Sequence, residues 1–211
     1  GILSALTALV VSFFFGPKLI SLLEGEKIGE VIRDDGPESH SSKQGTPTMG
    51  GLLILVSIAI STLIWADLSN IFILAILISM LFFGLIGFID DYMKFSGNKN
   101  GMKAVVKFTL QLCIAFGAMN YLFYASGQPI STEVLIPFTN NIMWDVGWMF
   151  LPFAMLVIVG SSNAANFTDG LDGLAIMPVV MISIALGIFA YVSGNFNFST
   201  YLDLPFLIEA G

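Results

Sequence analysis

Charge is scarce in this 211-residue chain, in which 11% of the residues are charged, 56% are hydrophobic and the mean hydropathy is +0.87. Soluble globular domains carry about 25% charged residues, so the composition excludes that class. Apolar runs of nearly twenty residues recur, and a helix of that length crosses a bilayer. The runs lack the alternation of barrel strands. We therefore expect an all-α, polytopic integral membrane helical protein.

Cysteine and histidine are nearly absent, with one residue of each kind. A single cysteine, Cys113, cannot form an internal disulfide, and its apolar surroundings oppose ionisation of the thiol. Together with His40 it cannot build a zinc site of the usual kind. Thiol chemistry and zinc chemistry are therefore disfavoured, and His40 is expected to be solvated or to orient a turn of its loop.

Basic residues are few and unevenly placed. Six spans are predicted, and all eight basic residues lie in or beside the first and third connections between them. The positive-inside rule makes these connections cytoplasmic, and alternation places the fifth connection on the same side. The formal charge of −7 indicates little about partners, because the carboxylates cluster in a few loops. The spans are 2–23, 49–65, 71–89, 104–124, 146–165 and 174–192, and the cytoplasmic loops are about 24–48, 90–103 and 161–173.

The remaining connections lie on the outer side. Residues 67–70 are predicted to form a tight turn, and residues 125–145 a longer loop. The whole chain, residues 1–211, is predicted to be one transmembrane domain. The chain begins with Gly1 and ends without a terminating signal, so both ends are expected to be truncated.

Two adjacent carboxylates, Asp90 and Asp91, follow an apolar run directly. Charges at membrane depth are expensive, so a pair of them indicates a functional site. Adjacent residues of a helix point about 100° apart, so different roles are expected for the two. Adjacent carboxylates are also a common way to hold magnesium. The alternative is that both are simply solvated beyond the helix end.

The first cytoplasmic loop ends in a pattern that suits anion binding. Thr46 can cap a helix, and Pro47 suits its first position, where no amide hydrogen is needed. The free amides and the positive helix end attract anions, and Lys43 lies three residues before the cap. A phosphate-bearing ligand would fit here, although a well-capped membrane helix explains the pattern equally well.

The fifth connection is rich in amides and carboxylates. Asn163, Asn166 and Asp169 are three residues apart, which places them along one face if the helix continues that far. Asp172 follows, and Gly170 permits a break before it. Such groups without a basic partner at membrane depth need a ligand or a metal. A polar turn between two helices is the alternative.

Four motifs in these loops together resemble the phospho-N-acetylmuramoyl-pentapeptide transferases. The resemblance covers nearly all of the chain and implies a ten-helix fold, of which one helix at the start and several at the end would be missing. The missing end would carry a third essential aspartate and a histidine-rich loop, and a further metal ligand is expected beyond residue 211. The 211 residues alone are therefore expected to be inactive. The motifs are Gly36-Pro-Glu-Ser-His40, Lys43-Gln-Gly-Thr-Pro-Thr-Met-Gly-Gly51, Phe88-Ile-Asp-Asp-Tyr92 and Asn163-Ala-Ala-Asn-Phe-Thr-Asp-Gly-Leu-Asp-Gly-Leu-Ala175.

The resemblance implies a magnesium-dependent enzyme of the bacterial cytoplasmic (inner) membrane, with its active site on the cytoplasmic face. It would transfer phospho-N-acetylmuramoyl-pentapeptide from its UDP carrier to undecaprenyl phosphate, giving lipid I and UMP in peptidoglycan synthesis. Nucleic acid is not an expected partner, and the oligomeric state is left open.

The resemblance also implies roles for single residues. Asp90 would be the base toward the lipid phosphate, with Asp91 as its catalytic partner. The metal ligands would include Asp91 and Asn166. The nucleotide pocket would be lined by Lys43, Thr48, Asn166, Asp169 and Asp172.

Two other functions stay open at this point. A sibling enzyme would transfer N-acetylhexosamine-1-phosphate to a polyprenyl phosphate with the same paired aspartates. A cation-coupled transporter would use the carboxylates as an ion path. Transporters commonly contain internal repeats, and the two halves of this sequence show no convincing repeat.

Overall fold

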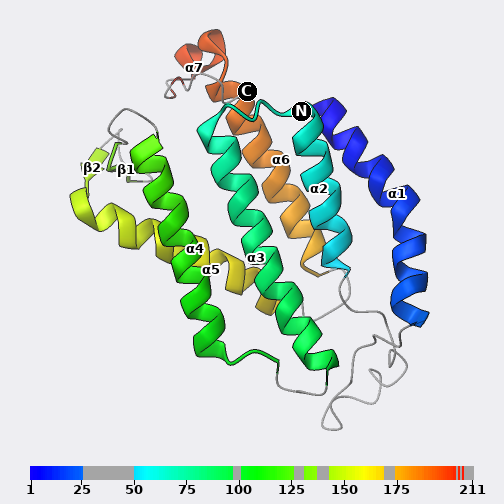
Figure 1. The fold of residues 1–211 in the computed structure, drawn as a ribbon. Coiled ribbons are helices and arrows are strands. Elements are labelled where there is room, and N and C mark those ends of the chain that lie inside the picture. The colour runs from blue at the N-terminus through cyan, green and yellow to red at the C-terminus, as the bar shows by residue number, and fades with distance from the viewer. Residues whose placement is uncertain are drawn as a thin grey trace. The chain divides into compact units, whose positions relative to one another are not determined.

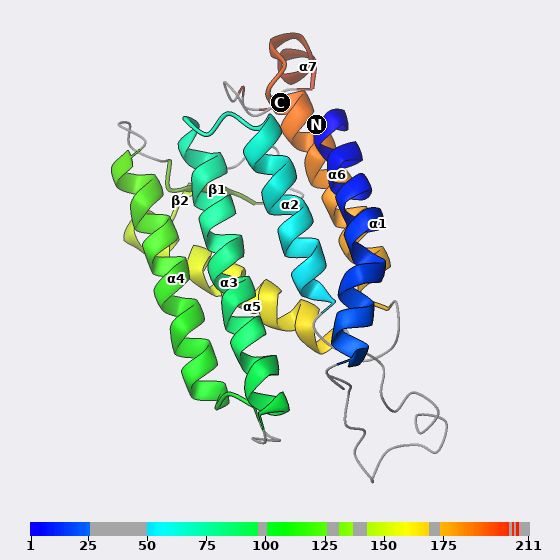
Figure 2. The ribbon, with the colours of Figure 1, turned by 45° about the vertical axis from the view of Figure 1, so that its right-hand side comes forward.

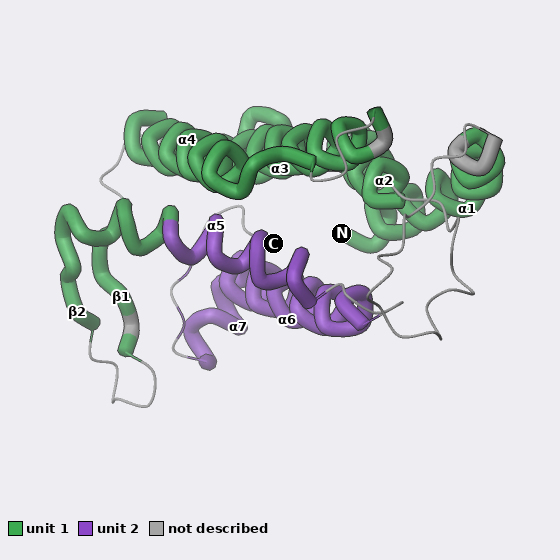
Figure 3. Tube along the Cα trace, turned by 90° about the horizontal axis from the view of Figure 1, so that it is seen from below, with its two compact units in different colours: residues 1–155 green, residues 156–211 purple. Residues whose placement is uncertain are grey.

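The structure is a computed structural model, and its fold is helical almost throughout the residues that it describes. The chain divides into two compact units, residues 1–155 and residues 156–211 (Figure 3). The division falls inside helix α5 (Phe150–Thr168). The described residues are 1–25, 50–96, 101–125, 131–136, 143–168 and 174–202, together with 204 and 206.

The first unit is built on four consecutive apolar helices. Each packs against the next, so that they form a row, and successive helices run in opposite directions (Figures 1 and 2). The end of the first helix, the start of the second, the end of the third and the start of the fourth therefore lie at the same end of the row. The helices are α1 (Ile2–Gly25), α2 (Gly51–Trp65), α3 (Ile71–Phe95) and α4 (Ala104–Ala125).

Five helical segments are long and apolar enough to cross a membrane: α1, α3, α4, the segment Gly147–Thr168 that contains α5, and α6 (Ile176–Ser193). This confirms the predicted helical membrane fold. The described part of the other predicted span, α2, has 15 residues and is therefore about 22 Å long, less than the roughly 30 Å of a hydrocarbon core. Its predicted first residue, Met49, lies outside the described residues.

Polar side chains join α1 to α2 within this apolar row. The Ser12 hydroxyl donates to the Ser57 hydroxyl at 2.9 Å, and the Trp65 indole donates to the Thr7 hydroxyl at 2.9 Å. Ser57 is 2% exposed, so its hydroxyl needs a partner inside the protein. Hydrogen bonds of this kind hold neighbouring membrane helices in register.

Glycine allows α2 and α3 to approach closely. A Cβ on Gly84 in α3 would overlap the side chain of Leu55 in α2. Gly87, one turn later in α3, has open space where its Cβ would be. Only the first of these glycines is therefore required by helix packing.

Substitution of Gly84 by Ala is expected to lower the free energy of unfolding by about 1–3 kcal/mol, because the added methyl overpacks the interface. Gly87→Ala is the matched control and is expected to leave stability unchanged or slightly raised. Thermal unfolding in detergent measures both. Equal unfolding temperatures for the two variants would contradict the close approach at Gly84.

The predicted tight turn at 67–70 is present between α2 and α3. The Ser69 amide and hydroxyl both donate to the Asp67 carboxylate, which lowers the pKa of Asp67. The Asn70 side chain accepts from the amides of Phe72 and Ile73 and so caps α3.

The outer loop predicted at 125–145 contains a short hairpin that was not predicted. Strands β1 (Glu133–Leu135) and β2 (Met143–Asp145) pair antiparallel, with Val134 opposite Trp144. A β-branched residue facing an aromatic one is a favourable cross-strand pair. Strands of three residues are too short to show an alternating pattern in the sequence, which is why the hairpin was missed.

A single 3-10 turn, η2 (Gly147–Met149), links the hairpin to α5. The Gly147 amide and the Thr132 hydroxyl both donate to the Asp145 carboxylate, and these bonds lower the pKa of Asp145. The carboxylate thus fastens the end of β2 to the turn that precedes α5.

The second unit contains the rest of α5 together with α6 and α7 (Phe196–Tyr201), which packs on α6. The Asn195 side chain accepts from the amides of Asn197 and Phe198 and caps α7. Large apolar side chains of α6, such as Met181 and Leu186, are 66% and 62% exposed, as expected for a surface that faces lipid.

Candidate functional site

The aspartate pair lies on the last turns of α3. The sequence placed Asp90 and Asp91 at the start of a loop, but the helix continues to Phe95. Lys94 explains the extension, because it pairs with both carboxylates one turn away and its positive charge suits a helix C-terminus. Both aspartates are therefore held on a helical backbone.

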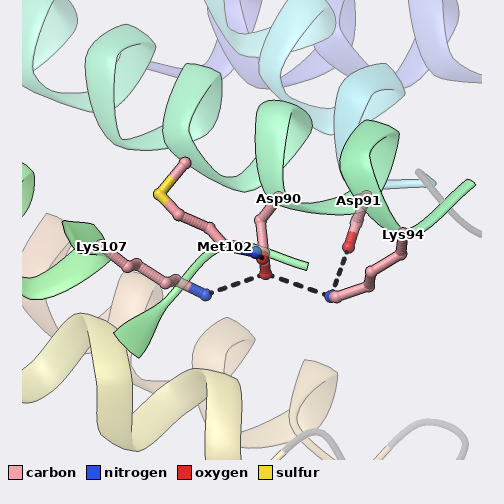
Figure 4. A network of polar contacts seen from close by, with 5 residues as sticks. All are labelled: Asp90, Asp91, Lys94, Met102 and Lys107. Atoms are coloured by element: carbon pink, nitrogen blue, oxygen red, sulfur yellow. Dashed lines mark hydrogen bonds and ion pairs between the residues drawn. The ribbon is translucent and has the colours of Figure 1, made fainter. Parts of the chain in front are cut away.

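Asp90 is surrounded by hydrogen-bond donors (Figure 4). Its Oδ1 accepts from the Met102 amide at 2.7 Å, and its Oδ2 lies 3.1 Å from Lys94 Nζ and 3.4 Å from Lys107 Nζ. The residue is 8% exposed. Asp90 therefore joins the end of α3 to the start of α4 through a largely buried, fully paired carboxylate.

Asp91 has a different environment. Its Oδ1 accepts from Lys94 Nζ at 2.9 Å, and its side chain is 39% exposed (Figure 4). The Lys94 side chain is 46% exposed. Solutes can reach the Asp91 carboxylate because it is exposed, and an exposed ion pair such as this contributes little to stability.

Gly101 makes the Asp90 contacts possible. Its φ of +63° is a left-handed conformation that favours glycine. A Cβ there would lie 2.5 Å from Asp90 Oδ1 and 2.9 Å from Lys94 Cε. The residue before Met102 must therefore lack a side chain if the Met102 amide is to reach Asp90.

Two carboxylates and two ammonium groups thus share this end of the first unit. The carboxylates suit a hydrated divalent cation, and the ammonium groups suit phosphate oxygens. Within the described residues, no three Asp, Glu, His or Cys side chains lie close enough to form a metal cage. Mg²⁺ usually needs only one or two carboxylates, with water and substrate phosphates as its other ligands, so the pair fits that ion.

The predicted residues of the other loops are only partly described. Asn163 and Asn166 lie three residues apart on α5, which the structure describes as far as Thr168. The Asn163 amide donates to the Val159 carbonyl at 2.8 Å, and Asn166 is exposed. Lys43, Thr48, Asp169 and Asp172 lie outside the described residues, as do Thr46 and Pro47.

Three participants at this site were missed from the sequence: Gly101, the Met102 amide and Lys107, which was used only as one of the basic residues that set the membrane orientation. Lys107 lies 17 residues from Asp90, and no sequence pattern connects the two. A glycine just before a helix start was the only available signal for the close approach.

Two protein-family models match the chain. Glycosyl transferase family 4 matches residues 73–209, which is more than half of the chain and includes the aspartate pair. Phospho-N-acetylmuramoyl-pentapeptide-transferase signature 1 matches residues 43–55, which run from Lys43 into the first turns of α2. The signature thus ends in Leu55, the residue that packs against Gly84 of α3. The chain belongs to glycosyl transferase family 4 and is a multi-pass membrane phospho-sugar transferase.

Proposed function

We propose that this protein transfers phospho-N-acetylmuramoyl-pentapeptide from UDP-N-acetylmuramoyl-pentapeptide to undecaprenyl phosphate, giving lipid I and UMP. The observation that carries the proposal is the signature match at residues 43–55, because that signature is named for this transferase. The match to glycosyl transferase family 4 supports the reaction class. A cation-coupled transporter does not account for either match.

In this reaction, an oxygen of the lipid phosphate bonds to the sugar-bearing phosphorus, and the bond from that phosphorus to UMP breaks. A phosphate monoester has a second pKa near 6 and is mostly ionised at neutral pH, so little proton removal is needed. Phosphoryl transfer depends mainly on positioning and on stabilisation of charge. The protein therefore has to hold two polyanions together at the membrane surface.

The resemblance predicts catalytic roles for the Asp90–Asp91 pair, and the neighbouring ammonium groups suit these polyanions. Lys94 lies between the two carboxylates and is half exposed, so its ammonium can meet a diphosphate. Lys43, Thr48, Asn166, Asp169 and Asp172 remain our prediction for the nucleotide pocket. Their assignment rests on the motifs that resemble the transferase family.

Mg²⁺ is the proposed cofactor, with Asp91 and Asn166 as predicted ligands. Asp91 suits this role because its carboxylate is exposed. When bound, the ion would neutralise the diphosphate and stabilise the charge that develops on the leaving UMP. The dependence of the rate on added Mg²⁺ tests the assignment.

The proposed location is the bacterial inner membrane, with the site on the cytoplasmic face. Lys94, Lys103 and Lys107 all lie near the end of α3 or the start of α4. Positive charge next to membrane helices favours the cytoplasmic side. A UDP-linked substrate made in the cytoplasm would reach the site from that side.

The substrate assignment is tested by offering two nucleotide sugars to the full-length enzyme with undecaprenyl phosphate and Mg²⁺. We expect UMP release and a lipid-linked product with UDP-N-acetylmuramoyl-pentapeptide, and little of either with UDP-N-acetylglucosamine. Preference for UDP-N-acetylglucosamine would instead support the sibling activity, transfer of N-acetylhexosamine-1-phosphate to a polyprenyl phosphate.

A further inference from the structure

The two adjacent aspartates differ in how they are held, and the difference separates their roles. Asp90 accepts from three donors: Lys94 in α3, the Met102 amide in the α3–α4 connection, and Lys107 in α4. Asp91 has an exposed side chain that meets Lys94 of its own helix. The Asp90 carboxylate thus connects parts of the fold, while the Asp91 carboxylate is accessible to solutes.

Asp90 is poorly arranged to take a proton from a substrate. A carboxylate accepts a proton at a lone pair that faces the donor, and the Met102 amide and two ammonium groups already occupy its two oxygens. The side chain is 11% exposed, and its partner Lys107 is 20% exposed. A substrate would have to displace these partners in order to reach it.

We propose that Asp90 is a positioning residue with Lys107 as its partner, and that Asp91 is the member of the pair that meets the substrate. The Asp90–Lys107 ion pair and the Asp90–Met102 hydrogen bond fix the start of α4 against the last turns of α3. That arrangement holds the helical turn that carries Asp91 and Lys94 in one position. This inference rests on the proposed phospho-sugar transfer for its kinetic part only.

Lys107→Met removes the ammonium while keeping an unbranched side chain, and Asp90→Asn removes the opposing charge. If the two residues act as one positioning unit, each variant lowers kcat by about 100-fold, as a displacement of about 1 Å does, with little change in KM. The double variant then has a kcat no lower than the worse single variant. Lys107→Arg, which keeps the positive charge, restores most of the rate.

The matched control is Lys103→Met, which removes the same charge four residues earlier, from a lysine outside the Asp90 network drawn in Figure 4. It is expected to keep kcat within a few-fold. Amide hydrogen exchange provides a readout without substrate. Exchange of the peptide that contains Met102 is expected to be faster in the Asp90→Asn and Lys107→Met variants, and unchanged in Lys103→Met and Asp91→Asn.

Multiplicative losses in the double variant, or unchanged exchange at Met102 in Lys107→Met, would overturn the positioning role. A normal rate in Asp91→Asn would overturn the assignment of the substrate-facing residue. If the wild-type enzyme transfers no phospho-sugar at all, the proposed function fails, while the exchange experiment still decides whether Asp90 and Lys107 hold the connection.

Discussion

Replacement of Asp91 by Asn is expected to lower kcat by about 100- to 1,000-fold while leaving the unfolding temperature nearly unchanged. The rate falls because the amide cannot carry the negative charge that would hold a cation beside the diphosphate. Stability is preserved because the exposed Asp91–Lys94 pair contributes at most about 1 kcal/mol. The measurements are the initial rate of UMP release and thermal unfolding in the same detergent.

The dependence of the Asp91→Asn rate on Mg²⁺ separates a metal ligand from other roles. If Asp91 holds the ion, the variant needs a higher Mg²⁺ concentration for half-maximal rate. Asp90→Asn serves as the neighbouring control, because it removes the same charge but also disturbs the α3–α4 connection. A variant of Asp91 that keeps its rate and its Mg²⁺ dependence would remove this residue from the mechanism.

The long apolar runs predicted the helices well. A segment that crosses lipid is recognised from its continuous apolar sequence, so no alternation of buried and exposed positions is needed. The end of α3 was less predictable. Apolar character stops at Ile89, but the helix continues to Phe95 because Lys94 pairs with the two aspartates one turn earlier. Hydropathy detects the membrane core, whereas ion pairs extend a helix beyond it.

The aspartate pair was predicted to mark a functional site because charges at membrane depth cost free energy. Different roles for the two residues were expected because adjacent residues of a helix point in different directions. The different surroundings of the two carboxylates depend on partners distant in sequence. Met102 and Lys107 reach Asp90 only because the chain turns at Gly101 and returns as α4. Such contacts are set by tertiary structure, so neither spacing nor composition indicates them.

Substitution of Gly101 by Ala is expected to lower the free energy of unfolding by about 2–5 kcal/mol. Roughly 1–2 kcal/mol comes from the left-handed backbone at φ +63°. A further amount of about 1–3 kcal/mol comes from overlap of the new Cβ with Asp90 Oδ1, from which it would lie 2.5 Å. Thermal or denaturant unfolding in detergent measures the loss, and kcat should fall with it because the Asp90 contacts are broken.

Gly147 provides a control that separates the two contributions. It has a similar φ of +53°, but a Cβ there has open space around it. Gly147→Ala should therefore show the backbone contribution alone, about 1–2 kcal/mol.

Asp90→Ala in the Gly101→Ala background removes the overlapping carboxylate, so the double variant should lose less stability than the sum of the two single losses. Equal losses for Gly101→Ala and Gly147→Ala, with additive effects in the double variant, would mean that Gly101 serves the backbone turn only. If Gly101→Ala loses more stability than Gly147→Ala and the effects in the double variant are not additive, glycine is required at position 101 because of the Asp90 carboxylate.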